Sequence, residues 1–359
     1  MSLPSNRGRP TRFTTVDNID TEAVPDWTTT MVKRADLAGE SIPSAIAIAA
    51  DYGAQLPIPG YGYTSTRWKI LALAAQANLT VARVLETHCD ALAILDEAGV
   101  ADSVPADGAQ GWGVCVGDTP GSDLTATEGP DGLRVTGTKA WCPLAGELGQ
   151  ALITAQVDDG SDTTGRRLFA VPLRVEGVRA EPAAIWVSRG LRTVTTGPVH
   201  FLQTPAQPIG AAGWFARRQG YAWGGMGSAA CWFGGALALA DTLRRSAVKR
   251  DDELTRLSVG TVDVALHAAA AALARAARLV DSGLADGRNG EVLALQVRGA
   301  VADAVENTLT QCAHTLGPAP LAFAEQHSRR VSDLSTYLRQ HRAEQDLARL
   351  GGLLLADSA

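Results

Sequence analysis

A polar turn and a tryptophan at the end of the next strong β-pattern are the residues in this chain best placed to do chemistry. The turn is Gly121-Ser122-Asp123, and the strand pattern ends in Gly137-Thr138-Lys139-Ala140-Trp141. Exposed backbone N–H groups in such a turn can receive a phosphate or the edge of a flavin ring. An indole at the far end of the strand can lie flat against a planar aromatic cofactor. Together the two features indicate a cofactor site.

Each feature also has an interpretation that involves no ligand. Trp141 can be a core residue at the end of a β-barrel, because its side chain is large and apolar. The turn that contains Ser122 is rich in Asp, Thr, Pro and Gly, all of which favour ordinary β-turns. The occurrence of Ser122 and Trp141 together favours the cofactor site.

This stretch resembles the middle β-domain of the acyl-CoA dehydrogenase family, whose pattern is roughly T-E-P-x-x-G-S-D followed by G-x-K-x-W. Residues 121–123 match the end of the first motif and residues 137–141 match the second. The resemblance implies that FAD is bound, with Trp141 packed against the flavin ring. It also implies an acyl thioester as the small-molecule substrate, and a homodimer or homotetramer formed through the C-terminal helices.

Several flavin positions differ from the family pattern. Two residues after the tryptophan the family has a hydroxyl that bonds toward the reactive flavin nitrogen, whereas this chain has Pro143. Cys142, between the two, is a weaker donor. The flavin-bonding Thr of the earlier turn becomes Val116 or Gly117, depending on one gap, and Cys115 precedes them.

The positions that the family uses for the adenosine half of FAD are also altered. Its Gln-x-x-Gly-Gly-x-Gly turn corresponds to residues 311–318, where only Gln311 and Gly317 are retained. Its R-x-x-F-G segment has no counterpart between Arg244 and Leu257. The cofactor-binding residues that the resemblance implies are Cys115, Val116, Gly117, Ser122, Trp141, Cys142 and Gln311.

The catalytic base of that family is a carboxylate, which removes an α-proton while hydride passes from the β-carbon to the flavin. Many members carry this Glu about eight residues after an Arg-Asp pair. The comparable position here is His341, eight residues after Asp333, with Glu344 one helical turn further on. Histidine can act as a base at neutral pH, since an unperturbed imidazole titrates near pH 6.5. The resemblance therefore implies His341 and Glu344 as catalytic residues; a solvated polar helix face explains the same residues without a role.

Glu86 and His88 form a second acid–base pair, on the second of two paired N-terminal helices. Both side chains can point into a site against the β-domain and contact the substrate. A buried histidine that satisfies a helix contact is the alternative. No three potential ligands in the sequence share the spacing of a metal site, so we predict no metal.

Hydrophobic periodicity divides the chain into helical, β and helical blocks. The pattern is helical from about Ser44 to Gly99, where glycine is a natural helix stop. Short β-runs follow, over residues 112–116, 133–141, 151–157, 167–171 and 199–202. Four long helical patterns then cover residues 219–247, 252–285, 290–315 and 319–350.

These blocks predict a mainly α protein with a central β-domain, arranged as in the acyl-CoA dehydrogenase fold. We expect a flexible arm over residues 1–24 and an N-terminal helical domain over residues 25–110. A middle β-barrel over residues 111–215 and a C-terminal four-helix bundle over residues 216–359 follow.

Composition and charge narrow the class of protein. The 359 residues carry a net charge of −6, which favours neither a nucleic-acid partner nor an anionic membrane surface. Five scattered cysteines, without a C-x-x-C pair, are typical of reduced thiols, and we expect a cytoplasmic protein. The polar N-terminus lacks the apolar core of a signal peptide. Residues 221–240 carry no charge but are rich in Gly and Ala, which predicts a buried helix rather than a membrane span.

Three functions are compatible with these features. The first is an acyl-CoA-dehydrogenase-like flavoprotein oxidoreductase, with an acyl thioester as CH–CH donor and FAD as acceptor. The second is a flavin-dependent monooxygenase on the same fold, which needs reduced flavin and oxygen but no α-proton base. The third is a non-catalytic paralogue, which altered cofactor loops would permit.

Overall fold

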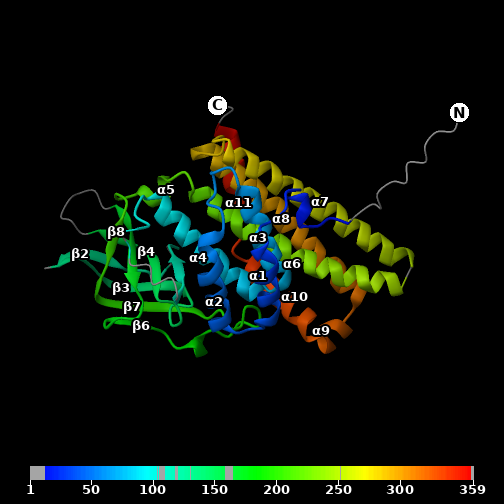
Figure 1. Cartoon of the computed structure of the whole chain (residues 1–359), viewed down its shortest axis with the longest axis horizontal. Helices are drawn as coiled ribbons and strands as arrows, with labels where there is room; N and C mark the ends of the chain where they lie inside the picture. The colour runs from blue at the N-terminus through cyan, green and yellow to red at the C-terminus, as the bar shows by residue number, and fades with distance from the viewer. Residues whose placement is uncertain are drawn as a thin grey trace.

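Two groups of helices, one from each end of the chain, lie beside a β-domain formed by the middle of the chain (Figure 1). The structure is a computed structural model and describes residues 13–102, 104, 110–117, 120–129, 131–157, 165–250 and 252–356. The predicted architecture, with helices on both sides of a central β-domain in sequence, is confirmed.

The N-terminal helices are held together by a buried asparagine at a helix junction. Asn78 has an extended backbone, and its side-chain oxygen accepts from the N–H groups of Thr80 (3.0 Å) and Val81 (3.3 Å). Its amide nitrogen donates to the carbonyl oxygens of Ala35 and Gly39, so one side chain both starts a helix and binds another. The helices are α1 (Trp27–Leu37), α2 (Ile42–Tyr52), α3 (Thr64–Ala77) and α4 (Leu79–Glu97), with short 3₁₀ turns η1 (Val16–Asn18) and η2 (Gly53–Gln55).

The prediction of a flexible arm over residues 1–24 is wrong for residues 13–24; residues 1–12 lie outside the described part of the chain. The backbone N–H of Thr14 donates to Asp263 at 2.8 Å, and Ile19 is buried in the main core. The Lys69 ammonium donates to the carbonyl oxygens of Asp20 and Glu22 and also pairs with the Asp17 carboxylate, 2.7 Å away. A buried lysine needs such partners, and this segment supplies them.

The β-domain is a barrel closed by one bent strand. Its hydrogen-bonded order is β6-β7-β3-β2-β4-β5-β8, with β1 paired to β4. Only Ala206 separates β7, which pairs with β3, from β8, which pairs with β5, so the chain itself closes the ring. The strands are β1 (Trp112–Cys115), β2 (Thr125–Gly129), β3 (Gly132–Pro143), β4 (Gln150–Val157), β5 (Arg166–Pro172), β6 (Val178–Ala180), β7 (Thr196–Pro205) and β8 (Gln207–Ile209).

The C-terminal part is a helical bundle whose last predicted helix is interrupted. One helix was expected over residues 319–350, but the chain is extended at Ala324 and leaves the helix again after Leu338. Ala343 then has a positive φ of 43°, a conformation that ends helical geometry for a residue with a Cβ. The helices are α5 (Trp214–Arg217), α6 (Tyr221–Lys249), α7 (Glu253–Asp281), α8 (Gly287–Leu316), α9 (Ala319–Phe323), α10 (Glu325–Leu338) and α11 (Glu344–Ala356).

Helix α6 is the central helix of the bundle, and the prediction that residues 221–240 form a buried helix is confirmed. Every residue from Met226 to Ala240 is buried. Gly234 packs so closely on the carbonyl of Ala72 that any side chain would collide with it. Helix α7 is long and apolar enough to cross a membrane by length and composition, with 33% of its apolar window buried. Length and composition alone also fit a helix packed in a bundle.

A loop of the β-domain docks onto α10 through a buried carboxylate. Asp333 accepts from the backbone N–H of Leu191 at 2.6 Å, where Leu191 has a positive φ of 48°. Burial, partly opposed by this hydrogen bond, raises the pKa of Asp333 to about 6. The preceding residue, Gly190, lies directly against the backbone of Ser332. The β-domain and the C-terminal helices therefore meet at a contact with no room for a larger side chain.

We expect Gly190→Ala to destabilise the protein by about 1–3 kcal/mol, because its methyl group would collide with the carbonyl of Ser332. The thermal unfolding midpoint measures the effect. Gly146→Ala, in another loop of the β-domain, is the matched control, since nothing lies within 4 Å of the added carbon. Equal midpoints for the two variants would contradict this account of the contact.

Candidate functional site

The polar turn is tied to the strand that carries the tryptophan. The Ser122 hydroxyl oxygen accepts from the N–H of Ala140 at 3.1 Å. Asp123 exchanges two hydrogen bonds with Thr138: its N–H donates to the Thr138 carbonyl at 3.0 Å, and its carboxylate accepts from the Thr138 N–H at 2.6 Å. The predicted proximity of the turn and the end of β3 is therefore present in the structure.

A β-bulge turns Trp141 out of the barrel. Lys139 is fully buried, and regular alternation would place Trp141 on the same inner face. The pairing of β3 with β7 slips between Lys139 and Cys142, so Cys142 points inward instead and the side chain of Trp141 is 54% exposed. The alternative interpretation of Trp141 as a barrel core residue is wrong.

The barrel interior next to the bulge holds a buried cation and two thiols. The Lys139 ammonium donates to the Thr154 hydroxyl oxygen at 2.8 Å, and that hydroxyl donates to the Val116 carbonyl at 3.3 Å. The pKa of the Cys115 thiol is lowered, first by a hydrogen bond from the Cys142 thiol and also by the charge of Lys139. Burial acts in the opposite direction. Cys115 and Cys142 are thus on the inner side of the sheet from Trp141, whereas Gly117 is exposed.

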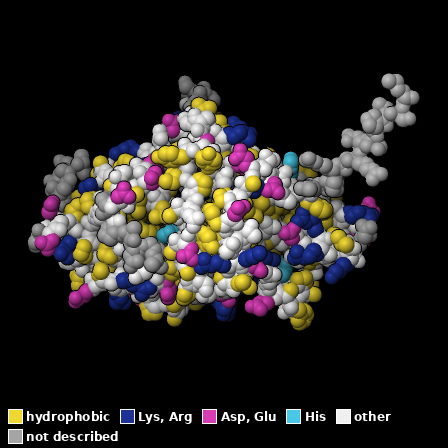
Figure 2. All heavy atoms as spheres, viewed as in Figure 1, with side chains coloured by type: hydrophobic (Ala, Val, Ile, Leu, Met, Phe, Trp, Pro, Cys, Tyr) yellow, Lys and Arg dark blue, Asp and Glu magenta, His cyan; other side chains and the backbone are white. Residues whose placement is uncertain are grey.

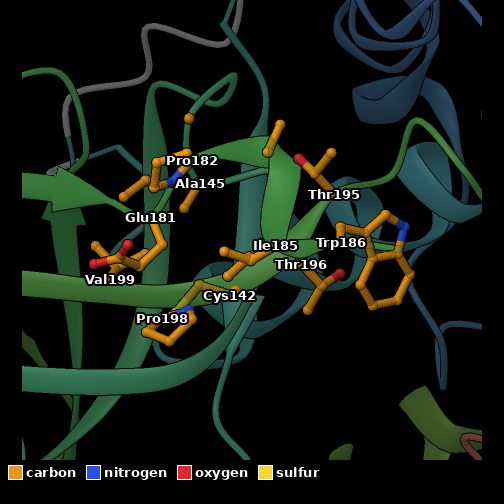
Figure 3. Close-up of a pocket in the computed structure, with 14 residues that line it drawn as sticks. Cys142, Ala145, Glu181, Pro182, Ile185, Trp186, Thr195, Thr196, Pro198 and Val199 are labelled. Atoms are coloured by element: carbon orange, nitrogen blue, oxygen red, sulfur yellow. The ribbon is translucent and has the colours of Figure 1, made fainter. Parts of the chain in front are cut away.

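A small recess lies beside Cys142, between β3, β7 and the segment around Ile185 and Trp186 (Figure 3). Its volume is about 20 Å³, room for about one water molecule. A planar cofactor ring does not fit there. Trp141 itself is exposed on the outer side of the strand.

The Glu86 carboxylate is buried and hydrogen-bonded to three other side chains. Its Oε1 accepts from the Ser228 hydroxyl at 2.7 Å. Its Oε2 accepts from Arg83 (3.0 Å) and from the Tyr337 hydroxyl (3.2 Å). Donors from α4, α6 and α10 therefore converge on this carboxylate.

His88 faces the β-domain, on another side of α4 from Glu86. Its Nδ1 accepts from the backbone N–H of Trp112 at 3.1 Å, and its ring fills the space against Gly53. Burial lowers the pKa of His88 to about 4, so the imidazole is neutral at pH 7. The structure does not bring Glu86 and His88 together in one site.

His341 lies in the loop between α10 and α11, where the sequence placed the base. Its side chain is 8% exposed, with Nδ1 3.0 Å from an Asp346 carboxylate oxygen, although without the geometry of a hydrogen bond. Its ring centre is 6.4 Å from that of Trp232. Glu344, the other catalytic candidate, is exposed in the first turn of α11. The structure thus places His341 next to Asp346, a residue that no motif in the sequence singles out.

A cavity of about 650 Å³ lies next to this loop, between α5, α6, α8 and α11. Gln340 and Arg342 of the loop line it together with Asp346, while His341 turns toward Trp232. Arg298 crosses the wall from α8, a position that carries no motif in the sequence. None of the residues that line this cavity belongs to β3. Gln311, a cofactor-binding candidate from the sequence, does not line it either and lies half-buried further along α8.

No family model matches the chain, and no curated protein matches it. Solved structures share its fold. The dibenzothiophene monooxygenase TdsC from Paenibacillus sp. A11-2 is 17% identical, with 92% of this chain and 96% of that chain covered and a TM-score of 0.76. KijD3, in complex with FMN and a dTDP-linked amino-keto sugar, is 18% identical over 96% of each chain, with a TM-score of 0.78. Butyryl-CoA dehydrogenase from Megasphaera elsdenii is 16% identical, with 93% and 99% covered and a TM-score of 0.72.

The chain therefore has the acyl-CoA dehydrogenase fold, as the sequence predicted. At this level of identity the comparisons concern architecture, and the role of each site residue stays a prediction. Within the described ranges, no group of three or more His, Cys, Asp or Glu side chains is arranged to hold a metal ion.

His88 makes the stability of the protein depend on pH. Its folded pKa is lowered from 6.5 to about 4, so its contribution is fully present above pH 6.5 and is lost as the pH falls toward 4. The loss amounts to about 3 kcal/mol. We expect His88→Gln, which can accept from Trp112 without titrating, to lose less stability than the parent between pH 7 and pH 5 in urea unfolding. His314→Gln, at an exposed histidine, is the control; parent-like pH dependence in both variants would refute the role of His88.

Proposed function

We propose that this chain is a flavin-dependent oxidoreductase that acts on a small-molecule substrate. The observation that carries the proposal is the exposed indole of Trp141, which a bulge turns out of the barrel beside a turn bonded to the same strand. The fold that the chain shares with FMN-bound TdsC and with XiaF in complex with FADH2 supports it.

Two features of the surface beside Trp141 support the proposal of a flavin there. The indole offers an open face for stacking on a planar ring. Gly117 has open space where a side chain would stand, so a ring edge or a phosphate can approach the backbone closely. Trp141 would hold the ring, and the turns at Gly117 and Ser122 would hold its edge or phosphate. A bound flavin supplies the hydride and oxygen chemistry that side chains lack.

FAD is the flavin that the sequence resemblance implies, and altered positions in the chain favour FMN as the alternative. In the family that the sequence resembles, a turn borders the adenosine half of FAD, and only Gln311 and Gly317 of that turn remain here. FMN lacks that half. Chromatography of the flavin released from the purified protein distinguishes the two.

Monooxygenation is the flavin reaction that the loop between α10 and α11 favours. Dehydrogenation of an acyl thioester needs a base at the α-carbon. Residues 339–343 contain no carboxylate, and His341 turns toward Trp232 rather than lining the cavity. A monooxygenase needs a reductant for the flavin, oxygen and a shielded cavity, but no such base.

Acyl thioester dehydrogenation is the second candidate, and the position of Asp346 favours it. An Asp346 carboxylate oxygen 3.0 Å from the imidazole can hold the His341 ring in one orientation. In this version a rotation of the side chain away from Trp232 would bring His341 to the substrate.

We also propose a cytoplasmic homo-oligomer. All five cysteines are free and buried, as suits a reducing compartment. Leu254, Leu257 and Val264 are exposed apolar residues on α7, and a partner helix could cover them. Dimer and tetramer stay open.

We expect Trp141→Ala to lower flavin retention after gel filtration at least several-fold, because stacking on the indole is lost. Absorbance at the flavin and protein bands of the purified sample measures the ratio. Phe323→Ala removes an aromatic side chain that is 90% exposed on α9 and should leave the ratio unchanged. Flavin content equal to the parent in Trp141→Ala would count against this location of the ring.

The two reactions differ in what reduces the flavin. We expect an acyl-CoA to leave the flavin oxidised under anaerobic conditions, whereas an external reductase and NADH bleach it and oxygen restores the colour with substrate hydroxylation. Anaerobic bleaching by an acyl-CoA, abolished in His341→Ala, would instead establish dehydrogenation with His341 as base.

A further inference from the structure

The 650 Å³ cavity is unusually rich in arginine. Its wall takes arginines from α5, α8 and α11 and from the loops before α6 and α11, and two acidic residues accompany them. Helices α5 and α11, which carry part of the wall, lie on the same side of the molecule (Figure 1). Figure 2 shows basic and acidic side chains interspersed over the helical half of its face, so an excess of one sign is a local feature. The arginines are Arg217, Arg218, Arg298, Arg342 and Arg349.

Two of these arginines are neutralised by carboxylates. Arg218 pairs with Glu97 at 2.6 Å, and Arg349 pairs with Glu291 at 2.5 Å. Their charges are compensated within the protein, and we assign them no ligand.

The other three have no carboxylate at ion-pair distance within the described ranges. Arg298 donates to the carbonyl oxygens of Gly225 (2.8 Å) and Gln340 (2.9 Å) and lies 4.7 Å from the ring centre of Trp232. Arg217 donates to the Ala212 carbonyl at 3.0 Å. Carbonyl oxygens orient the guanidinium groups of Arg298 and Arg217, and an indole also contacts that of Arg298, without cancelling their charge.

The remaining carboxylate of the wall, Asp346, forms no ion pair with these arginines and contacts other groups. Asp346 lies against His341 and accepts from the backbone N–H of Arg342 at 3.1 Å. The wall holds three arginines without an ion-pair partner among the described residues and one carboxylate that pairs with none of them, Asp346, which also attracts Arg298. These groups leave the wall positive, in a chain whose net charge is −6. Arg217 and Arg342 are exposed, so a ligand can reach their guanidinium groups, and the cavity is large enough for an anion of substrate size.

We propose that Arg217, Arg298 and Arg342 bind an oxyanionic group, a phosphate or a carboxylate, of the substrate. The planar forks of guanidinium groups match both oxyanions. The inference rests on the proposed function, because it assigns this cavity to the substrate of the flavin reaction, and it selects acidic substrates over neutral aromatic ones. Arg298 also links α6 to the loop before α11 through its bonds to the carbonyl oxygens of Gly225 and Gln340.

The experiment is calorimetric titration of the flavin-loaded and flavin-free protein with pyrophosphate, inorganic phosphate and succinate. We expect at least one of these anions to bind and Arg217→Gln and Arg342→Gln each to weaken it about tenfold. Arg250→Gln, at an exposed arginine paired with Asp252 beyond the other end of α6, is the matched control. A preference for pyrophosphate and phosphate indicates a phosphorylated substrate, and a preference for succinate indicates a carboxylate.

Two results would overturn the inference. One is the absence of anion binding, or binding that Arg217→Gln and Arg342→Gln leave unchanged. The other is competition between the anion and flavin, which would assign the arginines to the cofactor phosphate. Loss of flavin in Trp141→Ala is measured separately, so failure of the anion site and failure of the flavin site are distinguishable.

Discussion

The buried carboxylate of Glu86 is the interaction on which the arrangement of the helices depends. A charge without water is stable only when donors surround it, and here Arg83, Ser228 and Tyr337 do so from α4, α6 and α10. Removing one partner of such a buried set typically costs about 3–5 kcal/mol. Tyr337 is four residues before His341, so the same bonds fix where α10 ends and where the following loop begins. The wall of the large cavity is built on that loop.

In the β-domain, a break in strand pairing exposes the large apolar side chain of Trp141. The slip in pairing after Lys139 moves Trp141 out while Cys142 points inward. The buried Lys139 is acceptable because Thr154 supplies its hydrogen bonds. The bulge thus exposes an indole that regular alternation would bury in the barrel.

The same fold occurs in proteins whose sequences differ greatly from this one. TdsC and butyryl-CoA dehydrogenase share the architecture at 17% and 16% identity with this chain, and their names refer to different reactions. Packing of helices and strands tolerates such divergence because many apolar residues satisfy it, whereas a base or a flavin contact needs a particular group at one place. Residues 339–343, the loop between α10 and α11, contain no Asp or Glu.

Local pattern was enough to predict the order of the helical and β blocks, the buried helix beginning at Tyr221 and the association of Ser122 with the strand of Trp141, because periodicity and turn chemistry act between near neighbours in the chain. It did not predict the break of the last helix at Ala324 and Ala343, since periodicity continues across both. Strand register decides that Trp141 faces outward. Partners far away in sequence decide that Glu86 and His88 point to different sides of α4. The pairing of His341 with Asp346 and the convergence of Arg217, Arg298 and Arg342 exist only because separate helices pack together, and no spacing in the chain encodes that distance.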